Sequence, residues 1–563
     1  MLRKISNTIR YRNKLPACRL LFLGVLLPAL SVNTHAQLSM GGQPLKSRSR
    51  DHTIEWINLE ELRVDELLLE DEWLALTGKK NRRIAKEIQV SIRPEEMGRW
   101  EQLQDGTLVW RIGLRGKGAR SLGIVFSRYA LEKGTRIYIY NPSGEKVLGA
   151  FTDRNNKASG KLAVTYLPGQ ELIVQMEIPP ECDDYGELVI GSVRRAYLPV
   201  FEEKSVYDNN FGRSGDCNVD INCTLGEEWQ VLKNSVVRLI SVEKCTGVLI
   251  NNTLQDEKAY VYTAAHCVFQ NNKLQPIVFY FNYESPDCDG PDGSIANSIS
   301  EYTLIATGDT LENPRDTDSL DFALLELSVA PPDSFKPYFA GWNRSTGPAL
   351  HTTTIHHPSG DVKKIAVDLD PPETSYHDID YFPDLVRYSH WRILAWNDGT
   401  TEGGSSGCPL FNQDQLIVGT LTGGQANCSN SINDYFTKFD YAWDYYPEPS
   451  KQIKHWLDPD DSGVITLQGM PGYPVGLRNK AEEVNLRLYP NPAISQIIIE
   501  SGLSDGRNAE ISICDISGRK HTQRSIPWEG SAKINVSDLP SGLYLLSFRN
   551  GNGFTTRRFI ISR

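Results

Sequence analysis

Residues 401–411 read TEGGSSGCPLF, a glycine-rich turn with two consecutive serines that leads into an apolar segment. Glycines beside a serine let the backbone take conformations that a Cβ atom would hinder. A tight turn of this kind can point consecutive backbone N–H groups at one spot, as a developing oxyanion requires. The stretch therefore predicts that one of the two serines is a nucleophile. Taken alone it would be an ordinary flexible loop, so the rest of the chain has to supply the partners.

Two further patterns supply those partners. TAAHC (263–267) follows an apolar strand, and DFALL (321–325) opens another. A serine hydroxyl is a weak nucleophile and needs an imidazole to take its proton. The imidazole in turn needs a carboxylate that fixes its tautomer and stabilises its charged form. The order His266, Asp321, serine predicts a catalytic triad, with Asp318 as the alternative carboxylate.

The three motifs resemble those of chymotrypsin-like serine proteases. A closer resemblance is to bacterial lysyl endopeptidases, and it lies in GRSGDCNVDINC (212–223), HHPSGDVKKI (356–365), HWRILAW (390–396) and TEGGSSGCPLF (401–411). The resemblance implies a double β-barrel with the triad in the cleft between the barrels. Matching Gly-x-Ser-Gly-x-Pro to residues 404–409 makes Ser406 the nucleophile, His266 the general acid/base and Asp321 the group that orients it. The oxyanion hole would be the N–H groups of Gly404 and Ser406.

One position departs from the trypsin pattern. Ser405 stands where animal trypsins carry the aspartate that pairs with the new N-terminus on activation. A neutral serine cannot form that ion pair, so we expect a different activation mechanism. Cys408 lies close to Ser406 and offers a cysteine nucleophile as a weaker alternative.

The disulfide framework also follows from the resemblance. The chain has ten cysteines, and residues 217–428 contain seven of them, which are six apart from Cys408. Sequence alone leaves fifteen connectivities open for six cysteines. The resemblance implies the pairs Cys217–Cys428, Cys223–Cys288 and Cys245–Cys267. Cys182, Cys408 and Cys514 would then remain unpaired or pair otherwise.

A pocket for basic side chains needs a buried carboxylate. Aligned with the lysyl endopeptidases, Asp434 in DYFTKF (434–439) is the predicted pocket acid. The strand GTLTGG (419–424) would bind an extended substrate through its backbone, with Thr422 and Gly423 at the pocket. Two departures from the lysyl endopeptidases argue against a strict preference for lysine. Thr437 stands where those enzymes usually carry a glycine, and Thr422 stands where they carry a histidine.

The fold class is predicted to be all-β, and the chain divides into several parts. Short runs between residues 98 and 200, such as TLVWRIGL and ELIVQMEI, alternate apolar and polar residues between turn clusters, which is typical of an antiparallel β-sandwich or barrel. The acidic, leucine-spaced stretch at 60–76 predicts a helix. The expected domains are a signal peptide (1–36), a propeptide with a β-sandwich-like region (37–211), a trypsin-like protease domain (212–468), a linker (469–484) and a small β-sandwich (485–563).

The last domain resembles the type IX secretion sorting domain of Bacteroidetes. The resemblance lies in LYPNPA (488–493), ICDISGRK (513–520) and LPSGLYLLSF (539–548). A basic N-terminus, the apolar run Leu20–Leu30 and the small-residue site before Gln37 predict a secretory signal peptide. We therefore expect a protein that is secreted or held at the outer cell surface, with the type IX secretion machinery as a partner. Residues 37–211 resemble the β-rich propeptides of the lysyl endopeptidases, which implies that they assist folding and temporarily inhibit the enzyme, with Lys204 and Arg213 as processing candidates.

The remaining composition narrows the function classes. A formal net charge of −11 with no basic stripe argues against nucleic-acid binding. His351, His356 and His357 lie close in sequence, but no carboxylate or cysteine ligand is spaced with them as zinc sites need. No cofactor or metal is expected. The predicted function is a serine endopeptidase that cleaves proteins or peptides after basic residues, preferably Lys. The alternatives are a broader Lys/Arg protease and a catalytically silent adhesin on a protease scaffold.

Overall fold

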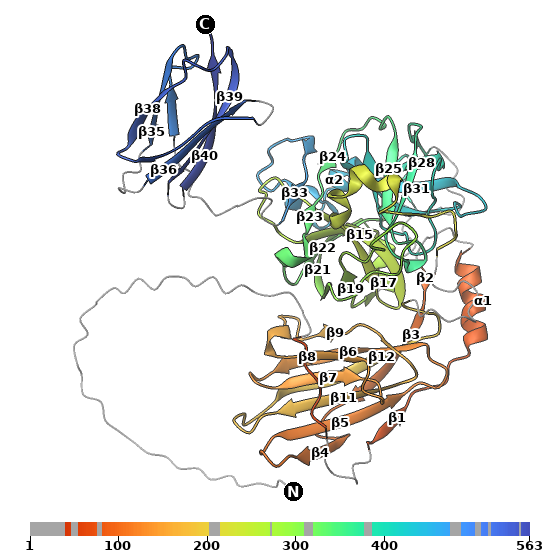
Figure 1. Ribbon diagram of the computed structural model, residues 1–563. Coiled ribbons are helices and arrows are strands. Elements are labelled where there is room, and N and C mark those ends of the chain that lie inside the picture. The colour runs from red at the N-terminus through yellow and green to blue at the C-terminus, as the bar shows by residue number, and fades with distance from the viewer. Residues whose placement is uncertain are drawn as a thin grey trace. The chain divides into compact units, whose positions relative to one another are not determined.

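The computed structural model (Figure 1) describes residues 40–46, 54–75, 82–201, 214–270, 273–308, 319–375, 385–472, 486–501, 508–515, 519–550 and 553–563. The predicted signal peptide, Asp318 and the processing candidates Lys204 and Arg213 lie outside the described residues. Within the described residues, no helix combines the length and apolarity that crossing a membrane requires.

The N-terminal domain packs two β-sheets against each other. One contains β1 (Trp56–Asn58), β4 (Arg99–Gln102), β5 (Leu108–Arg115), β7 (Arg136–Tyr140), β8 (Val147–Phe151) and β11 (Glu171–Ile178). The other contains β3 (Ala85–Ile92), β6 (Ser121–Leu131), β9 (Leu162–Ala163), β10 (Leu167–Pro168) and β12 (Gly186–Ala196). Their apolar faces share one core that includes Trp110, Phe126 and Val174. The predicted helix is α1 (Val64–Ala75).

The first sheet of the central domain, which the sequence predicts to be a protease domain, carries the strands that precede His266 and follow Asp321. It contains β14 (Val236–Ile240), β15 (Glu243–Ile250), β16 (Tyr260–Thr263), β19 (Val278–Tyr280), β20 (Ser298–Ser300), β21 (Tyr302–Thr307) and β22 (Ala323–Leu327). A short strand of the N-terminal domain, β2 (Arg82–Arg83), joins this sheet by pairing with β15. The apolar core on one side of the sheet includes Leu239, Phe279 and Leu325.

The second sheet carries the nucleophile loop and the predicted specificity residues. It contains β13 (Val219–Asp220), β24 (Trp342–Asn343), β25 (Thr352–His356), β26 (Lys364–Asp368), β27 (Glu373–Thr374), β28 (His390–Ala395), β29 (Pro409–Asn412), β30 (Ile417–Gly424), β31 (Ile432–Lys438) and β32 (Thr466–Leu467). A shared core joins the two sheets: Tyr262 of the first packs edge to face on Phe439, which opens helix α2 (Phe439–Asp444) after β31. Catalytic groups from both sheets can therefore meet between them.

The protease domain continues slightly past the predicted boundary at residue 468. β33 (Met470–Pro471) pairs with β23 (Tyr338–Phe339), and the Gly472 N–H donates to the Pro337 carbonyl at 2.8 Å. The C-terminal domain has one sheet of β34 (Leu486–Tyr489), β35 (Gln496–Ser501) and β38 (Ser531–Asn535), and another of β36 (Asn508–Asp515), β37 (Lys520–Pro527), β39 (Gly542–Asn550) and β40 (Gly553–Ile561). The prediction of an all-β fold is confirmed.

Candidate active site

His266 and Asp321 lie close together because strand β16 ends beside the start of its antiparallel partner, strand β22. β16 pairs antiparallel with β22, with Thr263 opposite Ala323. His266 lies in a short 3-10 turn after β16, and Asp321 comes just before β22. The His266 Nδ1 atom is 2.7 Å from Asp321 Oδ2, and the His266 backbone N–H donates to Asp321 Oδ1 at 3.0 Å. The carboxylate thus favours the tautomer with its proton on Nδ1 and leaves Nε2 able to accept a proton.

Ser406 lies on the nucleophile turn that the sequence predicts. Gly404 and Gly407 have φ angles of 106° and 78°, which only glycine adopts readily. β15 holds the turn, because the Thr246 N–H donates to the Ser406 carbonyl at 2.8 Å. On the other side, Cys267 Sγ lies 3.6 Å from the same carbonyl. The residue next to His266 therefore touches the backbone of Ser406.

The His–Ser arm of the predicted triad is not closed in this structure. Both His266 Nε2 and Ser406 Oγ are buried, and neither has a hydrogen-bond partner among the described residues. Catalytic hydrogen bonds are often long before substrate binds. The His–Asp arm is formed, whereas proton transfer from Ser406 requires its Oγ atom and His266 Nε2 to come within hydrogen-bond distance of each other.

The carbonyl groups of the turn point into the protein. The Ser359 N–H donates to the Gly403 carbonyl at 2.6 Å, and the Thr246 hydroxyl donates to the Gly404 carbonyl at 3.0 Å. No hydrogen bond from the N–H of Gly404 or Ser406 to a described residue is present. The N–H groups of Gly404 and Ser406, which the sequence predicts as the oxyanion hole, therefore have no partner among the described residues.

Ser405 makes contacts that fit its neutral side chain. Its hydroxyl oxygen is 2.8 Å from His356 Nδ1 and accepts the Glu402 N–H at 3.1 Å. The Nδ1 atom of the neighbouring His357 is 2.9 Å from the Asp361 carbonyl, and burial lowers the pKa of His357 well below its usual value. Both imidazoles thus have structural contacts. The sequence predicts no role for His356, because nothing in the motif indicates that it reaches Ser405.

Asp434 is a fully buried residue of β31 and contacts the segment that leads to Ser406. Its Oδ2 atom accepts hydrogen bonds from Trp396 Nε1 at 2.7 Å and from the Thr401 hydroxyl at 2.5 Å. In the sheet it lies opposite Gly424 of β30. Thr401 is five residues before Ser406 in the chain, so the carboxylate lies against the base of the nucleophile loop.

The hydroxyl groups of Thr422 and Thr437 both contact His390, for which the sequence predicts no role. Both hydroxyl oxygens are 3.1 Å from His390 Nε2, and they are 2.9 Å from each other. Burial lowers the pKa of His390 to about 4, so its imidazole is neutral at physiological pH. The Thr437 hydroxyl also lies 3.4 Å from the Asp321 carbonyl. An imidazole from β28 therefore contacts Thr422, the position where the lysyl endopeptidases carry a histidine. Gly423 lies next to it in β30.

The three disulfides of the described residues are the pairs that the resemblance implies. Cys217–Cys428 and Cys245–Cys267 have Cα–Cα distances of 5.5 and 6.1 Å, and Cys223–Cys288 has 4.5 Å. Cys182, Cys408 and Cys514 form no disulfide with any described residue. Cys408 is buried behind the nucleophile, where its Sγ atom is 3.1 Å from the Thr354 hydroxyl.

Comparison with known proteins shows which family the central part of the chain is similar to. Residues 211–437 match the family model "Lysyl endopeptidase, C-terminal domain". The resemblance to lysyl endopeptidases is confirmed. A lysyl endopeptidase of Pseudomonas aeruginosa is 27% identical over 294 residues, which cover 48% of this chain and 60% of that protein. The chain thus spans less than two thirds of the length of this relative.

The C-terminal domain also has a match. Residues 487–562 match the family model "Secretion system C-terminal sorting domain", which supports the predicted secreted or cell-surface location and an association with secretion machinery.

Two solved structures each align with 37% of the chain. A Glu endopeptidase has 16% sequence identity and a TM-score of 0.27, and the match covers 85% of that structure. Kallikrein-related peptidase 10 has 15% identity and a TM-score of 0.26, and the match covers 91% of that structure.

Proposed function

We propose that the protein is a secreted serine endopeptidase that cleaves peptide bonds after basic residues, preferably lysine. The observation that carries this proposal is the 2.7 Å contact between His266 Nδ1 and Asp321 Oδ2, with both residues 7% exposed, beside a turn that presents Ser406. A buried carboxylate that orients an imidazole next to a serine is the arrangement that acyl transfer requires.

The reaction proceeds in two stages. His266 Nε2 takes the proton of the Ser406 hydroxyl as its oxygen attacks the scissile carbonyl carbon. The Asp321 carboxylate stabilises the resulting imidazolium, and the Gly404 and Ser406 N–H groups stabilise the oxyanion. His266 then gives the proton to the leaving amine, and an ester to Ser406 remains. Water attacks this acyl-enzyme with His266 again acting as base, which releases the acid and restores the serine.

Preference for a basic side chain is assigned to Asp434. A buried carboxylate near the nucleophile favours a cationic group that can replace lost solvation. Trp396 and Thr401 hold one oxygen of this carboxylate in place. A fixed carboxylate suits the compact ammonium of lysine and, with looser geometry, the guanidinium of arginine. The Lys-only and the Lys/Arg alternatives therefore differ in the cleavage sites they predict.

The N-terminal domain is proposed to act as an inhibitory propeptide. β2 pairs with Glu243 and Lys244 of β15, two residues before Thr246, which holds the Ser406 carbonyl. Lys244 Nζ and Arg238 Nη2 donate to the carbonyls of Pro199 and Val200 at 2.9 and 2.6 Å. A strand edge beside the nucleophile is a place where an extended peptide can add. Occupation of this edge by β2 would exclude part of a substrate.

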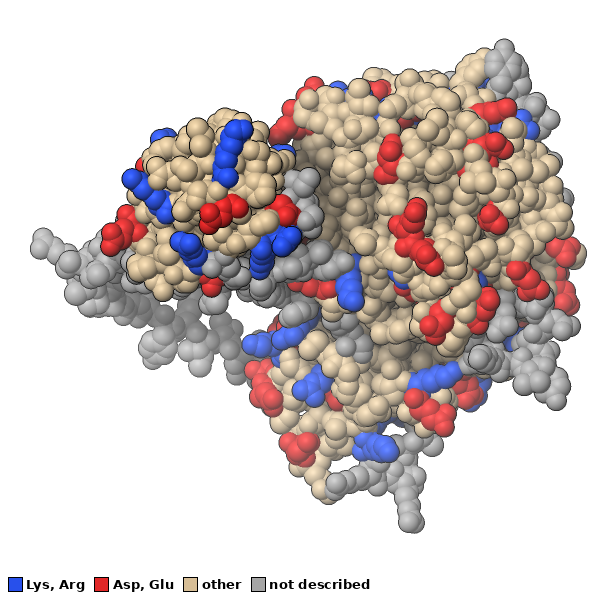
Figure 2. All heavy atoms as spheres, turned by 45° about the horizontal axis from the view of Figure 1, so that its top comes forward, with Lys and Arg blue, Asp and Glu red and all other residues tan. Residues whose placement is uncertain are grey.

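The surface is compatible with an exported enzyme that acts on proteins. Figure 2 shows one face of the molecule, on which acidic side chains are scattered among neutral ones and basic side chains form no continuous stripe. This agrees with the formal net charge of −11.

Labelling with a fluorophosphonate tests the enzyme class. The processed protein should react at Ser406 and hydrolyse a small lysine ester. Ser406→Ala should lose both properties and accumulate the unprocessed chain, whereas Ser405→Ala should still be labelled. Absence of labelling and hydrolysis in a correctly processed wild-type protein would favour the catalytically silent adhesin.

A further inference from the structure

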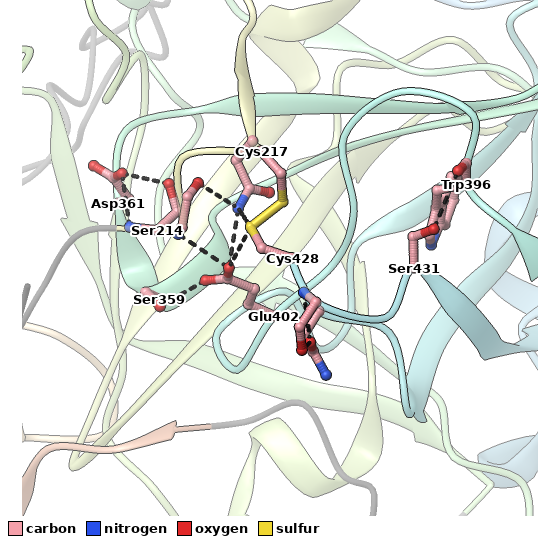
Figure 3. Close-up of a disulfide and its surroundings, with 12 residues drawn as sticks. Ser214, Cys217, Ser359, Asp361, Trp396, Glu402, Cys428 and Ser431 are labelled. Carbon is pink, nitrogen blue, oxygen red and sulfur yellow. Dashed lines mark hydrogen bonds between the residues drawn. A yellow bond between two sulfur atoms is a disulfide. The ribbon is translucent and has the colours of Figure 1, made fainter.

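Two carboxylates hold the segment that opens the protease domain (Figure 3). Ser214 donates to Asp361 Oδ2 from its N–H at 3.0 Å and from its hydroxyl at 2.7 Å. The Gly215 N–H and the Asn218 side-chain amide both donate to Glu402 Oε1, at 3.0 and 3.1 Å. The start of the domain is thereby attached to the loop that carries the nucleophile.

Gly215 allows the close approach that this attachment needs. A Cβ atom added at residue 215 would lie 2.8 Å from Glu402 Oε1 and even closer to Cys428 Sγ. The Cys217–Cys428 disulfide closes the other side of the same contact. Any larger side chain at residue 215 would therefore push the opening segment away from Glu402.

Glu402 is also part of the oxyanion turn itself. Its N–H donates to the Ser405 hydroxyl oxygen at 3.1 Å, and its carbonyl accepts the Ser405 N–H at 2.9 Å. Its second carboxylate oxygen, Oε2, accepts the Ser359 hydroxyl at 3.0 Å. The Ser359 N–H donates to the Gly403 carbonyl at 2.6 Å.

The hydrogen bond from the Ser359 N–H to the Gly403 carbonyl fixes the orientation of the Gly404 N–H, which is one of the two expected oxyanion donors. The Gly403 carbonyl and the Gly404 N–H belong to one planar peptide unit and point in opposite directions. Holding the carbonyl against Ser359 therefore turns the Gly404 N–H away from Ser359. Glu402 fixes Ser359 through its hydroxyl, and Arg82 of the N-terminal domain donates to the same hydroxyl at 3.1 Å.

We propose that Glu402 is a positioning residue for the oxyanion hole, which couples the opening segment Ser214–Asn218 to the Gly403–Gly404 peptide. Glu402 performs here the organising task that the ion pair of the N-terminus with an aspartate performs in trypsins, because Ser405 at that aspartate position is neutral and contacts His356. The catalytic part of this inference rests on the proposed peptidase function, whereas the coupling itself does not.

The test compares processed wild-type protein with Glu402→Gln, Gly215→Ala and the control Glu448→Gln, whose side chain is exposed. With a small lysine ester, Glu402→Gln and Gly215→Ala should lower kcat by about 10- to 100-fold and change KM by no more than about twofold. Binding of a peptide lysinal, which forms an oxyanion on Ser406, should weaken by a similar factor. Binding of n-butylamine, a ligand for the basic pocket alone, should be unchanged, and Glu448→Gln should behave as wild type.

Hydrogen exchange followed by mass spectrometry gives a readout that does not depend on activity. In Glu402→Gln, the amides of peptides that cover 214–218 and 403–407 should exchange faster together, with unchanged exchange in the C-terminal domain. Unchanged kcat, equal weakening of lysinal and butylamine, or exchange that rises in only one of the two segments would overturn the proposal. If the wild type does not hydrolyse the ester but both segments still deprotect together, the peptidase function fails and the coupling stands.

Discussion

Thr246 and Ser406 are joined by a backbone hydrogen bond of 2.8 Å from the Thr246 N–H to the Ser406 carbonyl. This bond connects the sheet that carries His266 to the loop that carries the nucleophile. The Thr246 hydroxyl adds a second connection, since it donates to the Gly404 carbonyl and accepts the His357 N–H. One residue of β15 thus sets the position of the nucleophile turn relative to the general base.

Replacing Thr246 by Val tests this connection. The substitution keeps the shape of the side chain but leaves the Gly404 carbonyl and the His357 N–H without their buried partner. We expect unfolding free energy to fall by about 1–3 kcal/mol and kcat/KM to fall by about tenfold. Urea denaturation and ester hydrolysis measure the two effects, with the exposed Thr303→Val as control. Equal activity of the two variants would show that the hydroxyl does not position the turn.

Asp321→Asn tests the role of the carboxylate. An amide can donate to His266 Nδ1 and would favour the tautomer that cannot accept the serine proton. The expected loss of kcat is about 10⁴-fold at neutral pH, with little change in KM. Steady-state kinetics check this, with the exposed Asp398→Asn as the matched variant. A loss below tenfold would assign the orienting role to another carboxylate, such as Asp318.

The contact between the N-terminal and protease domains should depend on pH through Glu301. The Ser159 hydroxyl of the N-terminal domain donates to Glu301 Oε2 at 2.9 Å, and burial raises the pKa of Glu301 to about 7, against the opposing effect of Lys157 and Lys161. A raised pKa means that the folded state binds the proton more tightly than the unfolded chain. This contribution to stability is present in full below about pH 4.5 and is lost as pH rises through about 7.

Unfolding of the full-length Ser406→Ala protein, followed between pH 5 and 8, measures that dependence. In Glu301→Gln, the unfolding free energy should fall less across this range than in the Ser406→Ala parent. The variant should therefore gain stability relative to the parent as the pH rises to 8. The same slope in both proteins would show that Glu301 does not take up a proton at the contact.

The Cys217–Cys428 disulfide should make a large contribution to the unfolding free energy. It closes a loop of 211 residues and lies beside the contact between Gly215 and Glu402. Replacing both cysteines by serine should lower the unfolding free energy by about 2–5 kcal/mol. Chemical denaturation of the full-length Ser406→Ala protein measures the loss, and Cys182→Ser in the same chain, which breaks no disulfide, should have a small effect. A double variant as stable as its Ser406→Ala parent would contradict this expectation.

The sequence predicts those parts of the site that depend on local pattern. The order of His266, Asp321 and the serine turn is readable because each follows or opens an apolar strand, and the sandwiches are readable from alternating strands. Contacts between residues that are far apart in the sequence cannot be predicted from such local patterns. Glu402 and Gly215 are 187 residues apart, and His390 reaches Thr422 only because β28 and β30 both pair with β31. Such contacts depend on strand order and register, which composition and spacing do not determine.

The central claim, a basic-residue endopeptidase that uses Ser406 and Asp434, is tested most directly by mapping its cleavage sites. Processed wild-type protein, Ser406→Ala and Asp434→Asn would each digest a denatured proteome, and mass spectrometry would identify the new peptide termini. The account predicts cuts after lysine, or after lysine and arginine, by the wild type, no cuts by Ser406→Ala, and a loss of basic selectivity with greatly reduced rate in Asp434→Asn. Cuts by Ser406→Ala, or wild-type cuts with no preference for basic residues, would contradict it.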